Sequence, residues 1–90
     1  MNIDWNRAGE EAVGWLQELL RFDTTNPPGN ELPLVRYMAE RLTAEGLAPR
    51  VLQSETKRGN LVVRLEGDGS ERPLLLLSHL DVVPAESEKW

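Results

Sequence analysis

The chain has 90 residues, of which 40% are hydrophobic and 28% charged, a composition typical of one small globular domain or a piece of a larger one. Ten Lys and Arg residues against fifteen Asp and Glu residues give a net charge of -5 without a basic stripe, which argues against a nucleic-acid partner. The absence of cysteine excludes disulfides and thiolate metal sites. No apolar stretch is long enough for a signal peptide or a membrane span, so we expect a soluble, cytoplasmic protein without a membrane partner.

The first predicted element is an amphipathic helix over residues 5–21. Asp4 is a suitable N-cap for it. Apolar side chains then recur at helical spacing. They are Ala8, Ala12, Val13, Trp15, Leu16, Leu19 and Leu20. We expect Trp5 and Trp15 to be core or helix-packing residues, since aromatic side chains at such positions seldom form a stacking platform.

A stiff loop over residues 23–30 precedes a second predicted helix. Two prolines fix φ in this loop, and Gly29 permits a tight reversal. We expect Asn30 to cap the helix, with Pro33 in the first turn, where a missing N–H costs little. Gly46 is the expected stop. The predicted buried stripe of this helix consists of Leu34, Val35, Met38 and Leu42.

The pattern then changes from helical to extended, and three strands are predicted. Residues 47–54 and 60–66 form the first two, joined closely enough for an antiparallel pair. Residues 74–77 are four leucines, a continuous run that is typical of a strand with apolar partners on both faces. Glycines in residues 67–69 lack the third glycine and the following helix that a phosphate-binding loop needs, so we expect a plain turn there.

The candidate chemistry lies directly after the leucine run. His79 is the only histidine of the chain, and neutral imidazole is the commonest side-chain ligand of zinc. Asp81 follows two residues later, on the same face of an extended backbone, so its carboxylate can orient the imidazole ring. Spacing alone leaves two other readings open. His79 could be structural or merely exposed, and Asp81 could cap a turn leading into Pro84.

Three blocks of the chain resemble the family of zinc-dependent deacylases and exopeptidases that includes acetylornithine deacetylase, succinyl-diaminopimelate desuccinylase, aminoacylase and the glutamate-releasing carboxypeptidase. Residues 78–84 (SHLDVVP) are similar to the family's first metal-ligand motif. Residues 22–31 are similar to its first loop, and residues 58–65 resemble the strand before the metal strand. Trp90 stands where the family often has a tryptophan. The one departure is Ser78, where glycine is commoner.

This resemblance implies a site with two zinc ions bridged by an aspartate and a water, although cobalt or manganese could replace zinc. His79 would bind one metal, and Asp81 would be the catalytic-site residue that orients it. The bridging aspartate, the general-base glutamate and the remaining ligands lie downstream of this motif in the family. Residues 1–90 would therefore be the incomplete N-terminal portion of a three-layer α/β catalytic domain, in the order α-α-β-β-β, without the inserted dimerisation domain.

The implied activity is hydrolysis of an amide or peptide bond in N-acyl amino acids or small peptides, by a parent protein for which a homodimer is the candidate assembly. Because a catalytic zinc needs about three protein ligands and the chain offers one recognisable ligand, we expect the 90-residue chain to be inactive by itself. We also expect it to be poorly stable, since the leucine strand would lack half of its covering layer. The alternative is a non-catalytic α/β interaction module that presents an unpaired strand edge. A single-metal storage or sensor site would need more ligands than we find.

Overall fold

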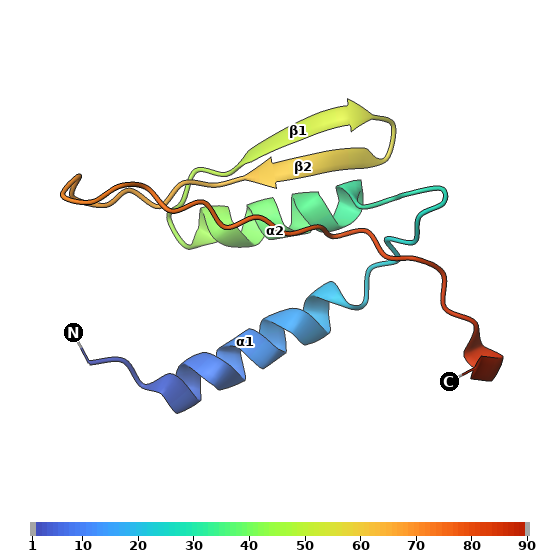
Figure 1. Cartoon of the computed structure of the whole chain (residues 1–90), viewed down its shortest axis with the longest axis horizontal. Helices are drawn as coiled ribbons and strands as arrows, with labels where there is room; N and C mark the ends of the chain where they lie inside the picture. The colour runs from blue at the N-terminus through green and yellow to red at the C-terminus, as the bar shows by residue number, and fades with distance from the viewer. Residues whose placement is uncertain (1, 90) are drawn as a thin grey trace.

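The computed structural model describes residues 2–89, and it shows a small α/β fold with two helices and a two-stranded antiparallel sheet (Figure 1). The elements, in chain order, are α1 (Trp5–Leu19), α2 (Leu32–Ala44), β1 (Arg50–Glu55), β2 (Arg58–Val62) and a short 3-10 helix, η1 (Ser87–Lys89). The predicted α/β class is confirmed, and the assignment to a three-layer catalytic domain stays a prediction. Neither helix within residues 2–89 has the length and apolar character needed to cross a bilayer.

Helix α1 begins where the sequence predicts. The Asp4 side chain accepts a hydrogen bond from the backbone N–H of Arg7 at 3.1 Å, which confirms Asp4 as the N-cap. The helix ends at Leu19, two residues before the predicted end. The chain then turns through Arg21, whose N–H donates to the Glu18 carbonyl, into the first loop.

Helix α2 differs from the prediction at its start. Its N-cap is Glu31 instead of Asn30, and Glu31 makes no side-chain capping bond because its carboxylate is directed to Arg58. Pro33 stands in the first turn, as predicted. Gly46 follows the C-terminus with φ of +88°, a left-handed conformation that favours glycine and ends the helix.

Strands β1 and β2 form a hairpin with a tighter turn than the sequence suggests. Arg50 pairs with Val62 and Leu52 with Asn60, and the register is irregular between Gln53 and Glu55. The hairpin packs on α2. Its strands are shifted relative to the predicted ranges because the turn is so short that pairing begins at the residue after Lys57, which adopts φ of +67°.

The core lies between α2 and the hairpin. Its buried apolar side chains are Leu32, Leu34 and Val35, the last fully buried. Gly59 of β2 is buried against Leu32, and a Cβ at residue 59 would lie only 2.8 Å from the Leu32 Cδ1 atom. The absence of a side chain at Gly59 therefore allows the helix and the strand to approach closely.

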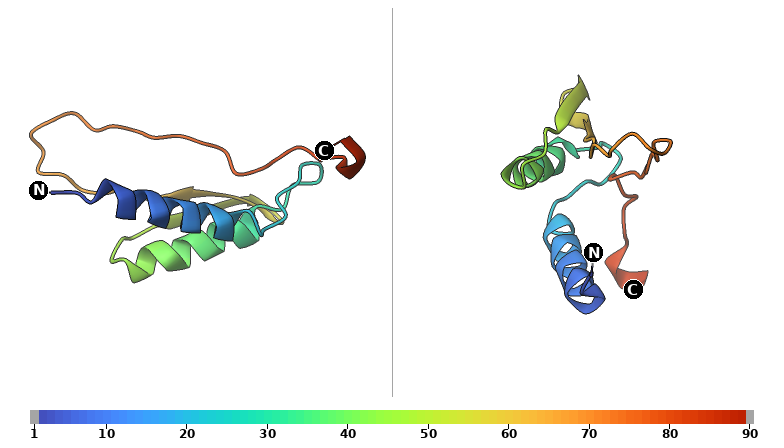
Figure 2. Two further views of the ribbon diagram at one scale, coloured as in Figure 1. Left: turned by 90° about the horizontal axis from the view of Figure 1, so that it is seen from below. Right: turned by 90° about the vertical axis from the view of Figure 1, so that its left-hand side faces the viewer.

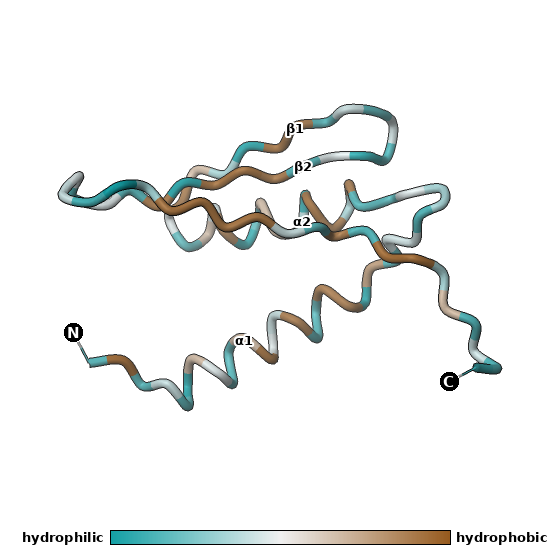
Figure 3. Tube along the Cα trace, in the orientation of Figure 1, coloured by the Kyte–Doolittle hydropathy of each residue, from teal (hydrophilic) through white to brown (hydrophobic). Residues whose placement is uncertain are grey.

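The predicted third strand is not formed, which corrects the β-β-β order. Residues 74–77 are extended but belong to neither strand of the sheet, and their leucines are 82–89% exposed. Figure 1 superimposes this segment on α2, but the turned views in Figure 2 show it standing apart, and Figure 3 shows its hydrophobic character. A strand needs a hydrogen-bonded neighbour, and within residues 2–89 this run has none.

Helix α1 is also less buried than its pattern predicts. None of its residues is buried, and Trp5, expected to pack, is 75% exposed. Trp15 is half-buried and lies under the Arg41 guanidinium, whose central carbon is 4.3 Å from the ring centroid. Arg41 also bonds Glu18 at 2.6 Å and Tyr37 at 2.9 Å, and Tyr37 donates to Glu18. Helix α1 is thus held to α2 by a polar and aromatic cluster and not by a shared apolar core.

Candidate functional site

The first loop holds the histidine motif in place through backbone contacts. Thr25 and Val82 form an isolated parallel bridge. The Val82 N–H donates to the Thr24 carbonyl at 3.1 Å, and the Asn26 N–H donates to the Val82 carbonyl at 2.8 Å. The buried Thr24 hydroxyl donates to the Leu80 carbonyl at 2.8 Å. The segment that carries the motif is therefore anchored immediately after the uncovered leucines.

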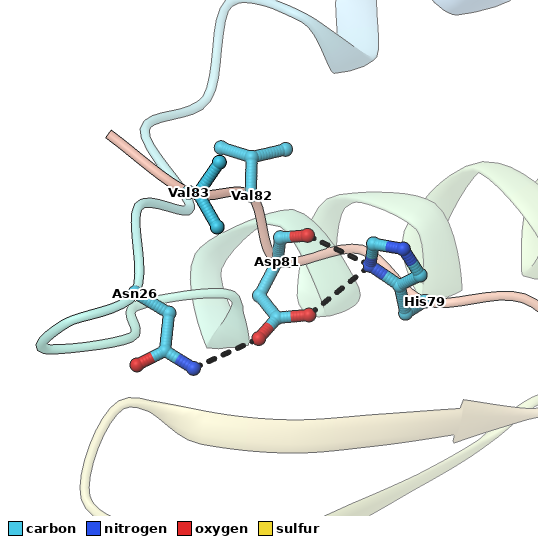
Figure 4. Close-up of a pocket in the computed structure, with 5 residues that line it drawn as sticks. All are labelled: Asn26, His79, Asp81, Val82 and Val83. Atoms are coloured by element: carbon cyan, nitrogen blue, oxygen red, sulfur yellow. Dashed lines mark hydrogen bonds and ion pairs between the residues drawn. The ribbon is translucent and has the colours of Figure 1, made fainter. Parts of the chain in front are cut away.

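The structure places the Asp81 carboxylate beside the His79 imidazole, as the spacing of two residues predicts (Figure 4). His79 Nδ1 lies 2.8 Å from the Asp81 carbonyl oxygen and 3.2 Å from Asp81 Oδ1. Both oxygens accept hydrogen bonds, so the neutral ring carries its proton on Nδ1. Nε2 is then left with a free lone pair on a side chain that is 83% exposed. This is the arrangement that a metal-binding histidine needs, while the ligand role itself stays a prediction.

The second oxygen of Asp81 faces a different pair of side chains. The Asn26 side-chain amide donates to Oδ2 at 2.9 Å, and the Arg58 Nη2 lies 3.8 Å from the same oxygen. The hydrogen bond from Asn26 lowers the pKa of Asp81 below its ordinary value, and His79 and Arg58 act in the same direction. Asp81 is thus held ionised, and two side chains from other parts of the chain fix the direction of its carboxylate.

Arg58 connects this carboxylate to a buried one. Its Nε donates to Glu31 Oε1 at 2.7 Å, and the Gly59 N–H donates to the same oxygen at 3.4 Å. Burial by itself raises the pKa of Glu31, but the hydrogen bonds from Arg58 and the backbone outweigh it, and the pKa lies below its ordinary value. The bond to Glu31 in turn raises the pKa of Arg58. The pair is therefore a charged ion pair at the foot of β2.

A shallow hollow of about 380 Å³ opens beside the imidazole. It is lined by Asn26, His79, Asp81, Val82 and Val83 (Figure 4). Two valines contribute apolar surface, and the side chains of Asn26, Asp81 and His79 contribute the polar part of the lining, with Asp81 between the other two (Figure 4). The hollow is an open depression at the surface and not an enclosed cavity.

These residues do not make a complete metal site. Within residues 2–89, no cluster of three or more His, Asp or Glu side chains could hold a metal ion. His79 offers one nitrogen, and the Asp81 carboxylate is already engaged on both oxygens. A catalytic zinc needs about three protein ligands, so the predicted two-zinc centre does not fit the described residues alone.

The sequence predicts no role for Asn26, Glu31 or Arg58, although all three lie within the blocks, residues 22–31 and 58–65, that resemble the deacylase and exopeptidase family. Each is an ordinary polar residue in a loop, at a helix start or at a strand end, and nothing in its type or spacing predicts a contact with a residue far away in the sequence. The one signal in the sequence that points to these residues is the resemblance of both blocks to the family whose metal motif residues 78–84 resemble. The prediction made for Trp90 lies outside the described residues.

Comparison with known proteins does not assign the chain to a family. No protein-family model matches the chain, and neither a curated protein nor a solved structure aligns with it significantly.

Proposed function

We propose that this chain contributes one corner of a two-metal site that hydrolyses amide bonds, with His79 as a metal ligand through Nε2 and Asp81 as the residue that orients it. The observation that carries the proposal is the pair itself. His79 Nδ1 is held by two oxygens of Asp81, and Nε2 is exposed at the edge of a hollow. Metal-bound histidines commonly have such a carboxylate or carbonyl partner on the other ring nitrogen. The resemblance of residues 78–84 to the first metal motif of zinc-dependent deacylases and exopeptidases supports the same assignment.

The proposed substrate class is an N-acyl amino acid or small peptide, cleaved at an amide bond by the complete site. Zinc is the proposed metal, with cobalt or manganese as substitutes at a His/carboxylate site. The other ligands and the general base are proposed to come from residues outside this sequence, because the described residues supply one ligand where about three are needed. The 90-residue chain is therefore expected to be inactive by itself.

Zinc titration of the isolated chain tests the ligand role. We expect Zn²⁺ to shift the imidazole resonances of His79 and to bind weakly, and we expect His79→Ala to abolish the binding measured by calorimetry. Asp68→Asn is the matched control, because it removes a carboxylate from an exposed turn of an acidic chain without touching the hollow. Asp68→Asn should keep the wild-type affinity, and zinc binding that persists in His79→Ala would overturn the assignment.

A hydrolysis assay tests the incompleteness of the site. With N-acetyl amino acids and zinc, cobalt or manganese, the purified chain should show no turnover above the metal alone. Turnover that His79→Ala abolishes, or tight binding of two metal ions per chain, would show that the described residues form a complete site after all.

The second candidate is a non-catalytic interaction module, and one observation favours it. The leucines of residues 74–77 are 82–89% exposed, and large exposed apolar patches mark interaction surfaces. The coding sequence beyond codon 90 separates the two candidates. A bridging aspartate followed by a Glu-Glu pair supports the hydrolase, whereas a stop codon directly after codon 90 supports the module.

A further inference from the structure

We infer that Glu31, Arg58 and Asn26 position His79 by fixing the orientation of the Asp81 carboxylate, an inference that rests on the proposed ligand role of His79. The chain of contacts runs from a buried carboxylate to an exposed imidazole. Glu31 holds Arg58 at 2.7 Å, and Arg58 faces Asp81 Oδ2 at 3.8 Å. The opposite oxygen, Oδ1, faces His79 Nδ1 at 3.2 Å. These are positioning residues, since none of the three contacts the imidazole nitrogen proposed to bind metal.

The exposure of the imidazole is the reason that it needs such support. The His79 side chain is 83% exposed and follows a leucine run with no covering layer within residues 2–89, so no packing fixes its rotamer. The side chains behind it are much less exposed, with 30% for Asp81, 31% for Arg58 and 10% for Glu31. Orientation of the ring must therefore be transmitted from the core side by polar contacts.

The two carboxylate oxygens of Asp81 have separate partners, and this separation directs Oδ1 to the imidazole, where it joins the Asp81 backbone carbonyl, 2.8 Å away, as an acceptor for Nδ1. Asn26 donates to Oδ2 at 2.9 Å and Arg58 approaches the same atom, so rotation of the carboxylate would break both contacts. Oδ1 is then the oxygen left to accept from His79. An acceptor on Nδ1 selects the tautomer with the proton on Nδ1 and the lone pair on Nε2.

The loop of residues 26–31 is shaped to admit Arg58. Gly29 has φ of +87°, and a Cβ there would lie 2.7 to 2.8 Å from atoms of the Arg58 side chain. The same loop supplies the Asn26 amide at one end and the Glu31 carboxylate at the other. One short segment thus provides both anchors and the space between them, which explains why Glu31 contacts Arg58 instead of capping α2.

The tautomer of His79 tests this inference, and the chain's single histidine makes its imidazole resonances unambiguous. The measurement is a multiple-bond ¹H–¹⁵N spectrum of the metal-free chain, at a pH where the ring is neutral. We expect the wild-type chain to be mainly in the Nδ1–H form. In Arg58→Gln the ratio of Nδ1–H to Nε2–H should fall about threefold, a change on the scale of one weakened hydrogen bond. Glu31→Gln should give a smaller fall in the same direction.

Arg64→Gln is the matched control, because Arg64 is exposed and pairs only with Glu66 among the described residues. It should leave the ratio unchanged. If Arg58→Gln fails to fold, Asn26→Ala decides, since it removes one donor to Oδ2 from a loop. A wild-type chain mainly in the Nε2–H form would overturn the inference. A folded Arg58→Gln variant with the wild-type tautomer ratio would also overturn it, and so would an Asn26→Ala variant with that ratio where Arg58→Gln does not fold. Because no metal is present, a failed zinc titration with the expected tautomer ratios would overturn the proposed function alone.

Discussion

Two apolar segments of this chain reach opposite outcomes. The apolar face at the start of α2 is buried under the β1–β2 hairpin, where Val35 is fully buried and Leu34 is 3% exposed. The leucines of residues 74–77 are more hydrophobic as a run, yet they are 82–89% exposed. Hydrophobicity gives a tendency to be buried, but burial also needs a facing surface, and for a strand a hydrogen-bonded neighbour. The α2 segment has the hairpin, and the leucine run has no such partner within residues 2–89.

The contrast is sharper because contacts with the rest of the fold begin a few residues after the leucines. Residues 80–82 are fixed by hydrogen bonds to the first loop, and Asp81 is held by Asn26 and Arg58. Hydrogen bonds between distant parts of the chain thus hold the candidate site in place, although no apolar packing covers the leucine run before it. The candidate site and the exposed leucine run are neighbours in sequence, but polar contacts hold the first in place and no apolar surface covers the second within residues 2–89.

The largest expected effect comes from truncating a leucine on each side of the comparison. Leu34→Ala should lower the free energy of unfolding by about 2 to 5 kcal/mol, because it opens a cavity in the core. Leu75→Ala removes the same atoms from an exposed position and should change stability by less than about 0.5 kcal/mol. Urea unfolding followed by circular dichroism measures both. Equal losses would show that the leucine run is covered in solution.

A pair of glycines gives the next largest difference, with opposite signs. A Cβ at Gly59 would lie 2.8 Å from the Leu32 side chain and 3.5 Å from the Leu52 carbonyl, so Gly59→Ala should cost about 1 to 3 kcal/mol. A Cβ at Gly14 in α1 meets nothing within 4 Å, so Gly14→Ala should stabilise the chain by about 0.5 to 1 kcal/mol. Thermal unfolding of the two variants tests the signs. A stable Gly59→Ala would mean that α2 and β2 pack less closely than described.

Lowering the pH should reduce the stability of the packing between α2 and the hairpin, because Glu31 becomes protonated. Its pKa is lowered in the folded chain from an ordinary 4.5, so its contribution to stability is present above about pH 4.5 and is lost as the pH falls through the lowered folded value. Glu31→Gln should remove this part of the pH dependence, an effect of less than about 1 kcal/mol. Urea unfolding between pH 7 and pH 3 measures it. Glu71→Gln, in an exposed turn, is the control and should keep the wild-type slope.

The smallest expected effect concerns the attachment of α1. Arg41 lies over Trp15 and bonds Glu18 and Tyr37, so Arg41→Gln should loosen α1 while α2 and the hairpin stay folded. Amide hydrogen exchange should speed up in α1 alone. Arg36→Gln changes an exposed arginine on the same helix and should leave exchange as in the wild type. Faster exchange throughout the chain would show that α1 belongs to one cooperative unit with the core.

Local sequence signals predicted where the helices begin and end better than they predicted which side chains and segments are packed against others. The Asp4 cap, Pro33 in the first turn of α2 and the stop at Gly46 are confirmed, because each depends on contacts within a few residues. The predictions that Trp5 is packed and that residues 74–77 form a strand are wrong. Both depended on partners elsewhere in the chain, which an apolar pattern can require but cannot supply.

The same division holds at the candidate site. The spacing of two residues between His79 and Asp81 by itself determined that their side chains share a face, because extended backbone alternates its side chains. Only the tertiary structure decided which partners hold Asp81. Asn26, Arg58 and Glu31 come from a loop, a strand and a helix start, and they meet because the first loop bonds to Val82 and the hairpin packs on α2. Side-chain direction follows from local backbone geometry, whereas a network across three segments exists only once the chain has folded.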